Sequence, residues 1–280
     1  MTFRDWQSLE PAEASRELHR RVRTLPPAQQ RAIIAHLPSE HDLADTFARS
    51  SSSAPLSRVP YLLKDLFDVT NVPTFAGSTF LPEVRPTPPR NSHLVDALNS
   101  AGAVFAGKTH LHEFAYGITG ENPHYGDCEH PRLAGRTTGG SSSGSAAAVA
   151  AGIVPLAIGT DTGGSVRVPS AFCGLFGFRL TPGDPFISDA VSLSRTCDTA
   201  GWFTADARDL RETIAALIGL SPAPASTPRG CFLELTGLDP DVALTFRTAA
   251  ADFASPADTT TRDTLLAGFA PTLDAYNTIV

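Results

Sequence analysis

The sequence predicts an α/β protein: an α/β/α sandwich whose mixed β-sheet is covered by helices and preceded by a short helical segment. Residues 91–101 have helical spacing and precede the apolar strand 103–106. An Ala-rich helix over residues 145–151 precedes a second apolar strand, which ends at Ile158. Helices that alternate with short apolar strands are typical of a sheet with helices packed on it.

The N-terminal part is predicted to be helical, because three of its segments open with residues that are typical of helix starts. These residues are Pro11, the proline pair 26–27 and Ser39. A serine run at 50–53 then predicts a linker, and the apolar stretch 59–69 predicts the first strand of the main domain. We expect a helical segment over residues 1–50 and a main domain over residues 56–280.

After the second strand the alternation continues through the apolar residues 172–178 and a predicted amphipathic helix over 208–220. The proline-rich and serine-rich stretch 221–228 predicts a surface connection.

Composition limits the classes of function. A net charge of −7 argues against a nucleic-acid or anionic-membrane surface, and 42% hydrophobic with 18% charged residues indicates a globular chain. The apolar run 146–158 contains Gly152 and Pro155 and is too short to span a bilayer. No signal sequence is recognisable, and the four cysteines are widely spaced, which predicts reduced thiols, no zinc site and a cytoplasmic location.

Two glycine-rich turns flank the Ala-rich helix and carry the functional prediction. The first is Gly139-Gly140-Ser141-Ser142 and the second is Thr162-Gly163-Gly164-Ser165. A flexible linker is the alternative, but a linker would not carry the uninterrupted apolar segment 153–158 between its glycines. Because helix and strand can bring the two turns together, we expect Ser141 and Ser165 to lie in one site.

A phosphate loop is the first competing interpretation, because residues 102–109 match G-x-x-x-x-G-K-[ST] letter by letter. That mechanism needs a loop whose free N–H groups hold phosphates, whereas residues 103–106 are themselves strand-like. Nucleotide binding is therefore a remote alternative, and Lys108 and Thr109 are predicted to begin the turn after the strand.

A nucleophile elbow is the second competing interpretation, since residues 140–144 fit G-x-S-x-G. That fold needs its histidine after the serine, and all eight histidines of this chain precede it. A metal site at His110, His112 and Glu113 is a further alternative, but their spacing is not that of a known zinc motif, and we interpret them as solvated residues of a helix face.

Without a suitable histidine, a serine nucleophile needs another base, and a desolvated lysine is the main known one. The chain holds only two lysines, Lys64 and Lys108, and arginine cannot lose its proton at neutral pH. Lys64 ends the apolar run 59–63, where burial would lower the pKa of its ammonium group. A salt bridge at a strand end is the alternative role for Lys64.

These stretches resemble the amidase signature family, hydrolases with a Ser-Ser-Lys triad. The resemblance covers residues 60–182 and includes the two turns, the run 159–169 and the segment 171–174. It implies Ser165 as nucleophile, Lys64 as base and Ser141 as a bridging serine after a cis peptide bond. It further implies backbone N–H groups of Thr162, Gly163, Gly164 and Ser165 as the oxyanion hole, with no metal and no cofactor.

The resemblance implies an amidase that hydrolyses a carboxamide C–N bond through an acyl-serine intermediate. Ala115, Tyr116 and Gly117 match a family segment that borders the acyl pocket beside Ser141, although Tyr116 suits an ordinary core position equally well. The pair Arg167 and Asp161 is predicted to be a structural ion pair that holds the second turn.

Two other functions stay open: a glutaminase-type subunit of a tRNA-dependent amidotransferase, and an inactive relative. Family members are usually longer, so we expect the main domain to be truncated on its C-terminal side. The expected partners are a small-molecule amide and a second copy of the chain in a homodimer, with no nucleic acid and no membrane.

Overall fold

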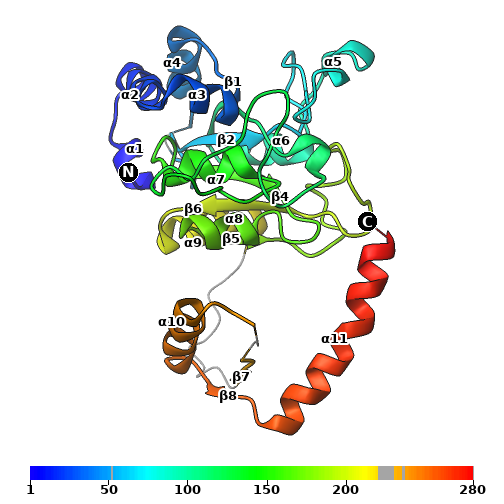
Figure 1. Cartoon of the computed structure of the whole chain (residues 1–280). Helices are drawn as coiled ribbons and strands as arrows, with labels where there is room; N and C mark the ends of the chain where they lie inside the picture. Colours follow the sequence, from blue (N-terminus) through cyan, green and yellow to red (C-terminus); the bar gives the residue numbers. More distant parts are fainter. Residues whose placement is uncertain (52, 220–229, 235–236, 280) are drawn as a thin grey trace. The chain divides into compact units, whose positions relative to one another are not determined.

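The computed structural model describes residues 1–51, 53–219, 230–234 and 237–279. Its contacts divide the chain into two compact units, Met1–Leu220 and Ser221–Val280. All predicted site residues belong to the first unit (Figure 1).

The first unit contains a six-stranded mixed sheet in the order β1-β3-β2-β4-β6-β5. Its strands are β1 (Ile34–His36), β2 (Pro60–Lys64), β3 (Val104–Thr109), β4 (Leu156–Thr160), β5 (Phe176–Arg179) and β6 (Ala200–Thr204). The three central strands β3, β2 and β4 run parallel, whereas β1, β6 and β5 are each antiparallel to their neighbours. The mixed sheet predicted from the sequence is thus confirmed.

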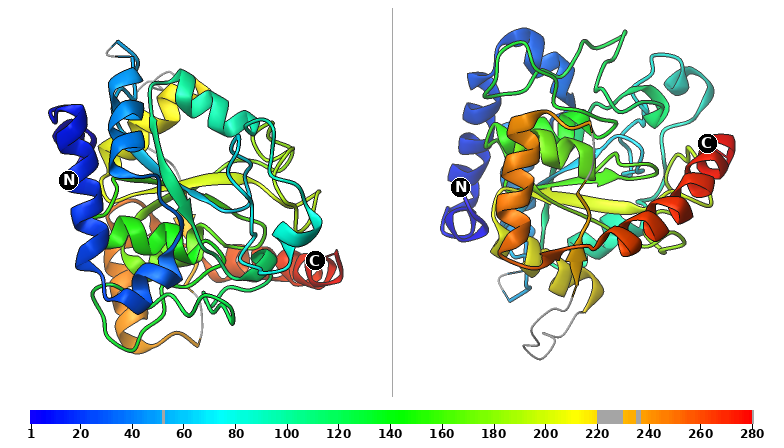
Figure 2. Two further views of the ribbon diagram at one scale, coloured as in Figure 1. Left: turned by 90° about the horizontal axis from the view of Figure 1, so that it is seen from above. Right: turned by 60° about the horizontal axis from the view of Figure 1, so that its bottom comes forward.

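Helices lie against both faces of this sheet, as Figure 2 shows for two further views. The helices of the first unit are α1 (Phe3–Gln7), α2 (Pro11–Thr24), α3 (Pro27–Ile33), α4 (Glu40–Arg49), α5 (Leu81–Val84), α6 (His93–Ser100), the 3-10 turn η1 (Glu113–Ala115), α7 (Ser143–Ala150), α8 (Arg167–Cys173) and α9 (Ala207–Ile218). The helices predicted over 91–101, 145–151 and 208–220 correspond to α6, α7 and α9.

The alternation of side chains along β2 explains the three layers. Leu62 packs into one apolar cluster with α2, α4 and α7, while Tyr61 and Leu63 pack into another with α6 and α9. All five residues of β2 are buried, as expected for a central parallel strand that is covered on both faces. Three alanines of α7, Ala146, Ala147 and Ala148, are buried as well, and their small side chains let this helix approach the sheet closely.

The parallel centre of the sheet determines where the site lies. Because parallel strands end at the same edge, Lys64 at the end of β2 lies beside Thr109 at the end of β3 and near Thr160 at the end of β4. In open α/β sheets, ligands bind at this carboxyl edge. Both glycine-rich turns also meet the sheet there, one before α7 and one after β4.

The predicted N-terminal helices are present as α2, α3 and α4, and the Ser39 hydroxyl caps α4 by accepting the N–H of Asp42 at 3.1 Å. The strand β1, which the sequence did not predict, lies between α3 and α4 in the chain and pairs with β3. Residues 1–50 belong to the same compact unit as the sheet.

The second unit contains the short parallel strands β7 (Cys231–Phe232) and β8 (Ser255–Pro256) and the helices α10 (Pro240–Ala251) and α11 (Thr259–Ile279). The surface connection predicted at 221–228 lies outside the described residues. Within the described residues, the helices are too short or too polar to cross a bilayer.

Candidate active site

Lys64 is the centre of the site. Its side chain is fully buried, and Nζ donates hydrogen bonds to Ser141 Oγ at 2.8 Å and to Thr160 Oγ1 at 2.8 Å. Both partners are hydroxyl groups and carry no charge. Burial consequently lowers the pKa of Lys64 to about 7, against the opposite influence of the Asp161 and Asp198 carboxylates.

Ser141 follows a cis peptide bond with Gly140, as the family resemblance implies. The backbone approaches its neighbours closely at this turn, since a Cβ atom on Gly140 would lie 2.8 Å from the backbone nitrogen of Gly120. The N–H of His112 donates to the carbonyl oxygen of Ser141 at 3.1 Å and fixes the turn from the other side. The Ser141 side chain is fully buried and is held toward Lys64.

Ser165 lies at the end of the second turn and is 5% exposed. The two turns are adjacent, because the N–H of Ser142 donates to the carbonyl oxygen of Ser165 at 3.4 Å. Among the hydrogen bonds of the described residues, however, Ser165 Oγ has no partner, whereas Ser141 Oγ bonds to Lys64. The structure thus joins Lys64 to Ser141 directly and brings Ser165 next to them without the second side-chain contact.

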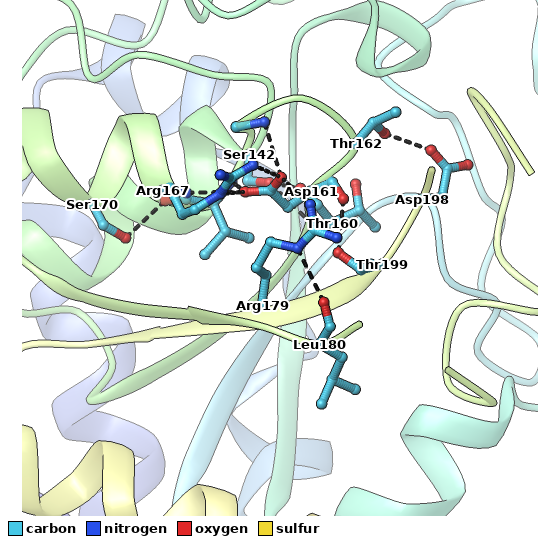
Figure 3. A network of polar contacts seen from close by, with 12 residues as sticks. Ser142, Thr160, Asp161, Thr162, Arg167, Ser170, Arg179, Leu180, Asp198 and Thr199 are labelled. Atoms are coloured by element: carbon cyan, nitrogen blue, oxygen red, sulfur yellow. Dashed lines mark hydrogen bonds and ion pairs between the residues drawn. The ribbon is translucent and has the colours of Figure 1, made fainter. Parts of the chain in front are cut away.

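Asp161 holds the second turn in place (Figure 3). Its carboxylate accepts the N–H groups of Gly164 at 2.9 Å and of Val166 at 3.1 Å, and it forms ion pairs with Arg167 and Arg179. Burial opposes ionisation here, but the bonds from Arg167 and from the backbone lower the pKa of Asp161. The predicted ion pair between Arg167 and Asp161 is confirmed, with Arg179 as a second cation.

The backbone N–H groups of the turn differ in their availability. Those of Thr162, Gly163 and Ser165 have no protein acceptor in the described part of the chain, and Gly163 is exposed. The N–H of Gly164 donates to Asp161, so this predicted oxyanion donor is occupied in the structure. With respect to the residues that the structure describes, the other three predicted donors are free to bind a negatively charged oxygen.

The geometry agrees with the comparison to known proteins. A family model described as Amidase matches residues 27–245. The chain belongs to the amidase family. This result confirms the resemblance that was identified from the two glycine-rich turns.

Several amidase relatives are known by name. "Amidase 1" of Oryza sativa subsp. japonica is 40% identical over 195 residues, which are 68% of this chain and 45% of that protein. "Indoleacetamide hydrolase" of Pseudomonas savastanoi is 41% identical over 186 residues, or 65% of this chain and 40% of that protein. This amidase chain thus spans less than half the length of these curated relatives.

Solved structures show the same fold. A crystal structure of an amidase superposes with a TM-score of 0.78 at 29% identity, covering 100% of this chain and 76% of that one. A 6-aminohexanoate cyclic dimer hydrolase complexed with substrate superposes with a TM-score of 0.77 at 26% identity, covering 89% of this chain and 57% of that one.

The segment predicted to border an acyl pocket lies after β3. Ala115 is buried, Tyr116 is 68% exposed, and Gly117 packs so closely on the ring of His112 that a Cβ atom there would be 2.3 Å from it. The alternative that placed Tyr116 in the core is therefore wrong.

The competing motifs have structural explanations. Residues 104–109 form strand β3 without a loop, and Lys108 Nζ lies 2.6 Å from Asp65 Oδ1 in a fully buried ion pair, so the phosphate-loop pattern does not form a phosphate cradle. His110 is 5% exposed and stacks on Tyr125 with ring centroids 3.7 Å apart, which overturns its interpretation as a solvated helix-face residue. Burial lowers the pKa of His110 to about 4. No cluster of metal ligands exists among the described residues.

Two residues of the candidate site were missed in the sequence. Thr160 binds Lys64, and its position in the run 159–165 between strand and turn was the available signal. Asp198 accepts a hydrogen bond from the hydroxyl of Thr162, and it lies in a stretch that matches the family pattern only loosely.

Proposed function

We propose that the chain hydrolyses a carboxamide C–N bond to a carboxylate and ammonia or an amine through an acyl-Ser165 intermediate. The observation that carries this proposal is the hydrogen bond of 2.8 Å between the buried Lys64 Nζ and Ser141 Oγ. A lysine that has a pKa of about 7 and hydroxyl partners is suited to accept a proton near neutral pH.

The proposed reaction begins with proton transfers along the two serines. Neutral Lys64 accepts the hydroxyl proton of Ser141, which accepts that of Ser165 as Ser165 Oγ attacks the amide carbonyl carbon. For this step Ser165 Oγ must approach Ser141 Oγ, a contact that tightens in many active sites only once substrate is bound.

The tetrahedral intermediate carries a negatively charged oxygen, for which the free N–H groups of Thr162, Gly163 and Ser165 are the proposed donors. One such donor is typically worth about 3 to 4 kcal/mol. Collapse of the intermediate breaks the C–N bond, and the leaving amine takes the proton back through Ser141. Water then attacks the acyl-Ser165 ester by the same proton path and releases the acid.

Labelling with a fluorophosphonate tests this proposal, because the reagent phosphonylates an activated serine and releases fluoride. We expect an adduct on Ser165 by peptide mapping, and release of ammonia or amine from simple carboxamides. The adduct should be absent in Ser165→Ala. Folded native protein that gives no adduct would identify the chain as an inactive relative.

A second candidate function follows from a relative in Aromatoleum aromaticum that is named as one of the subunits of glutamyl-tRNA(Gln) amidotransferase. It is 40% identical over 184 residues, or 66% of this chain and 37% of that protein. In that case the substrate would be glutamine and a partner protein would be required. Ammonia release from free glutamine, measured with and without partner proteins, separates the two functions. The homodimer stays a prediction, which the mass of the protein in solution tests.

A further inference from the structure

Asp198 lies directly behind the second glycine-rich turn and belongs to none of the groups that the proposed reaction uses. The side chain is 4% exposed, and its Oδ1 accepts a hydrogen bond from the hydroxyl of Thr162, as Figure 3 shows. Thr162 is the first residue of the turn whose N–H groups are the proposed oxyanion donors. A buried carboxylate is thus hydrogen-bonded to the turn.

The other oxygen of Asp198 binds a different segment. Oδ2 accepts the hydroxyl of Ser192 at 2.8 Å and the N–H groups of Leu193 at 2.9 Å and of Ser194 at 3.0 Å. Together with the Thr162 hydroxyl, four hydrogen-bond donors and, among the residues that the structure describes, no acceptor contact the two oxygens, which is the arrangement that an ionised carboxylate satisfies. One carboxylate therefore ties residues 192–194 to the turn.

The negative charge of Asp198 also acts on Lys64. Asp161 and Asp198 are the two carboxylates that favour the protonated form of this amine and oppose the larger effect of burial. Asp161 is itself paired with Arg167 and Arg179, whereas the contacts of Asp198 come from neutral hydroxyl and N–H groups.

Two more ionisable groups complete these surroundings. Arg195 lines a cavity of about 200 Å³ together with Asp198. His112 lies close enough to Lys64 for the positive charge of Lys64 to disfavour protonation of His112.

We propose that Asp198 is a positioning residue of the hydrolytic site, whose buried carboxylate fixes the oxyanion turn through Thr162 and ties it to residues 192–194. This inference rests on the proposed function and adds to it a residue that lies outside the proposed proton path from Ser165 to Lys64. Fixing the turn affects how fast Ser165 reacts. The negative charge favours the protonated form of Lys64, against the larger effect of burial, and so raises the pH above which Ser165 reacts.

The test is the rate of fluorophosphonate labelling of Ser165 as a function of pH, measured on the full chain. Asp198→Asn keeps the size of the side chain and removes its charge, so the pKa of Lys64 falls further and its neutral form persists to lower pH. We expect the acid limb of the profile to move to lower pH by about half a unit. We also expect the plateau rate to fall about tenfold to a hundredfold, because the turn loses its anchor.

Two matched variants separate these effects. Thr162→Val removes the bonded hydroxyl but keeps the backbone N–H and the charge of Asp198, so the plateau should fall while the acid limb stays in place. Asp189→Asn removes a charge from the same segment, where Asp189 accepts the N–H of His93, and should change neither the plateau nor the limb.

An Asp198→Asn profile that coincides with the native one would overturn the inference, and so would an equal shift in Asp189→Asn. If Asp198→Asn does not fold, a native plateau rate in Thr162→Val overturns it instead. A native protein that is not labelled at all contradicts the proposed function itself, so the two failures are distinguishable.

Discussion

The two lysines of this chain are both fully buried at the ends of neighbouring parallel strands, yet they have opposite surroundings. Lys64 Nζ bonds to the hydroxyl groups of Ser141 and Thr160, whereas Lys108 Nζ lies 2.6 Å from the Asp65 carboxylate. An ammonium group that is buried among hydroxyl groups loses its proton readily, whereas one beside a carboxylate stays charged and forms an ion pair. The partner, and not the burial, therefore separates the candidate base from the structural cation.

The sheet itself keeps the two lysines apart. A register shift between β2 and β3 pairs Lys108 with Leu63 and Thr109 with Lys64. Since consecutive residues of a strand point to opposite faces, the two ammonium groups lie on opposite sides of the sheet. Gly107, with φ of +137°, occupies the irregular position, and a Cβ atom there would lie 2.3 Å from the carbonyl oxygen of His36.

The largest expected effect comes from removing the candidate base. In Lys64→Ala the serines lose their proton acceptor, so we expect the fluorophosphonate labelling rate of Ser165 to fall about a thousandfold or more. Circular dichroism and thermal unfolding of the same sample check that the variant is folded. A folded Lys64→Ala protein that is labelled within tenfold of the native rate would show that the base lies elsewhere.

The matching change beside the other lysine should act on stability. Asp65→Asn leaves the Lys108 ammonium group buried without its counter-charge, so we expect the free energy of unfolding in urea to fall by about 3 kcal/mol. The double variant Asp65→Asn with Lys108→Met removes both charges and should regain most of this loss. A single variant that loses less than about 1 kcal/mol would mean that the pair contributes little.

The pH dependence of the labelling rate tests the role of Lys64 as the base. Burial lowers the pKa of Lys64 to about 7, so the neutral amine predominates above that pH and the ammonium form below it. The labelling rate should rise about tenfold per pH unit below pH 7 and level off above it, because only the neutral form accepts a proton. A rate that falls across pH 6 to 9 in stable protein would exclude Lys64 as the base.

Much of the fold was predictable because its signals are local. Helix starts at Pro11 and Ser39, and the helix–strand alternation around α6 and α7, follow from short-range patterns of sequence. Strand β1 is only three residues long, and its pairing with β3 depends on contacts that are distant in sequence, so no local pattern indicated it. The burial of His110 against Tyr125 has the same non-local origin.

The candidate site was also predictable in part. Eliminating histidine and arginine as bases left two lysines, and the family resemblance then singled out Lys64. The hydroxyl of Thr160, the carboxylate of Asp198 and the occupied N–H of Gly164 were not foreseen, since each depends on how turns and strand ends meet in space. Residue types identify the reactive groups, and the tertiary structure determines what supports them.

The smallest expected effects concern the threonine that accompanies each lysine. Thr160 Oγ1 accepts from Lys64 at 2.8 Å and Thr74 Oγ1 accepts from Lys108 at 3.0 Å, so valine removes one hydroxyl from each nitrogen at nearly constant volume. One hydrogen bond is worth about 1 kcal/mol. We therefore expect Thr160→Val to slow labelling of Ser165 by about threefold to tenfold, because Nζ is less well oriented toward Ser141.

Thr74→Val is the matched control, since Thr74 also donates to Asp68 at 2.8 Å and contacts no serine of the site. Because the hydroxyl of Thr74 makes two hydrogen bonds, its loss should lower the free energy of unfolding by about 2 kcal/mol. The labelling rate should stay within about twofold of the native value. Measured side by side, the two variants should affect different properties, rate for Thr160 and stability for Thr74. If Thr74→Val slowed labelling as much as Thr160→Val, the two lysines would belong to one coupled network, and their separation by the sheet would not hold.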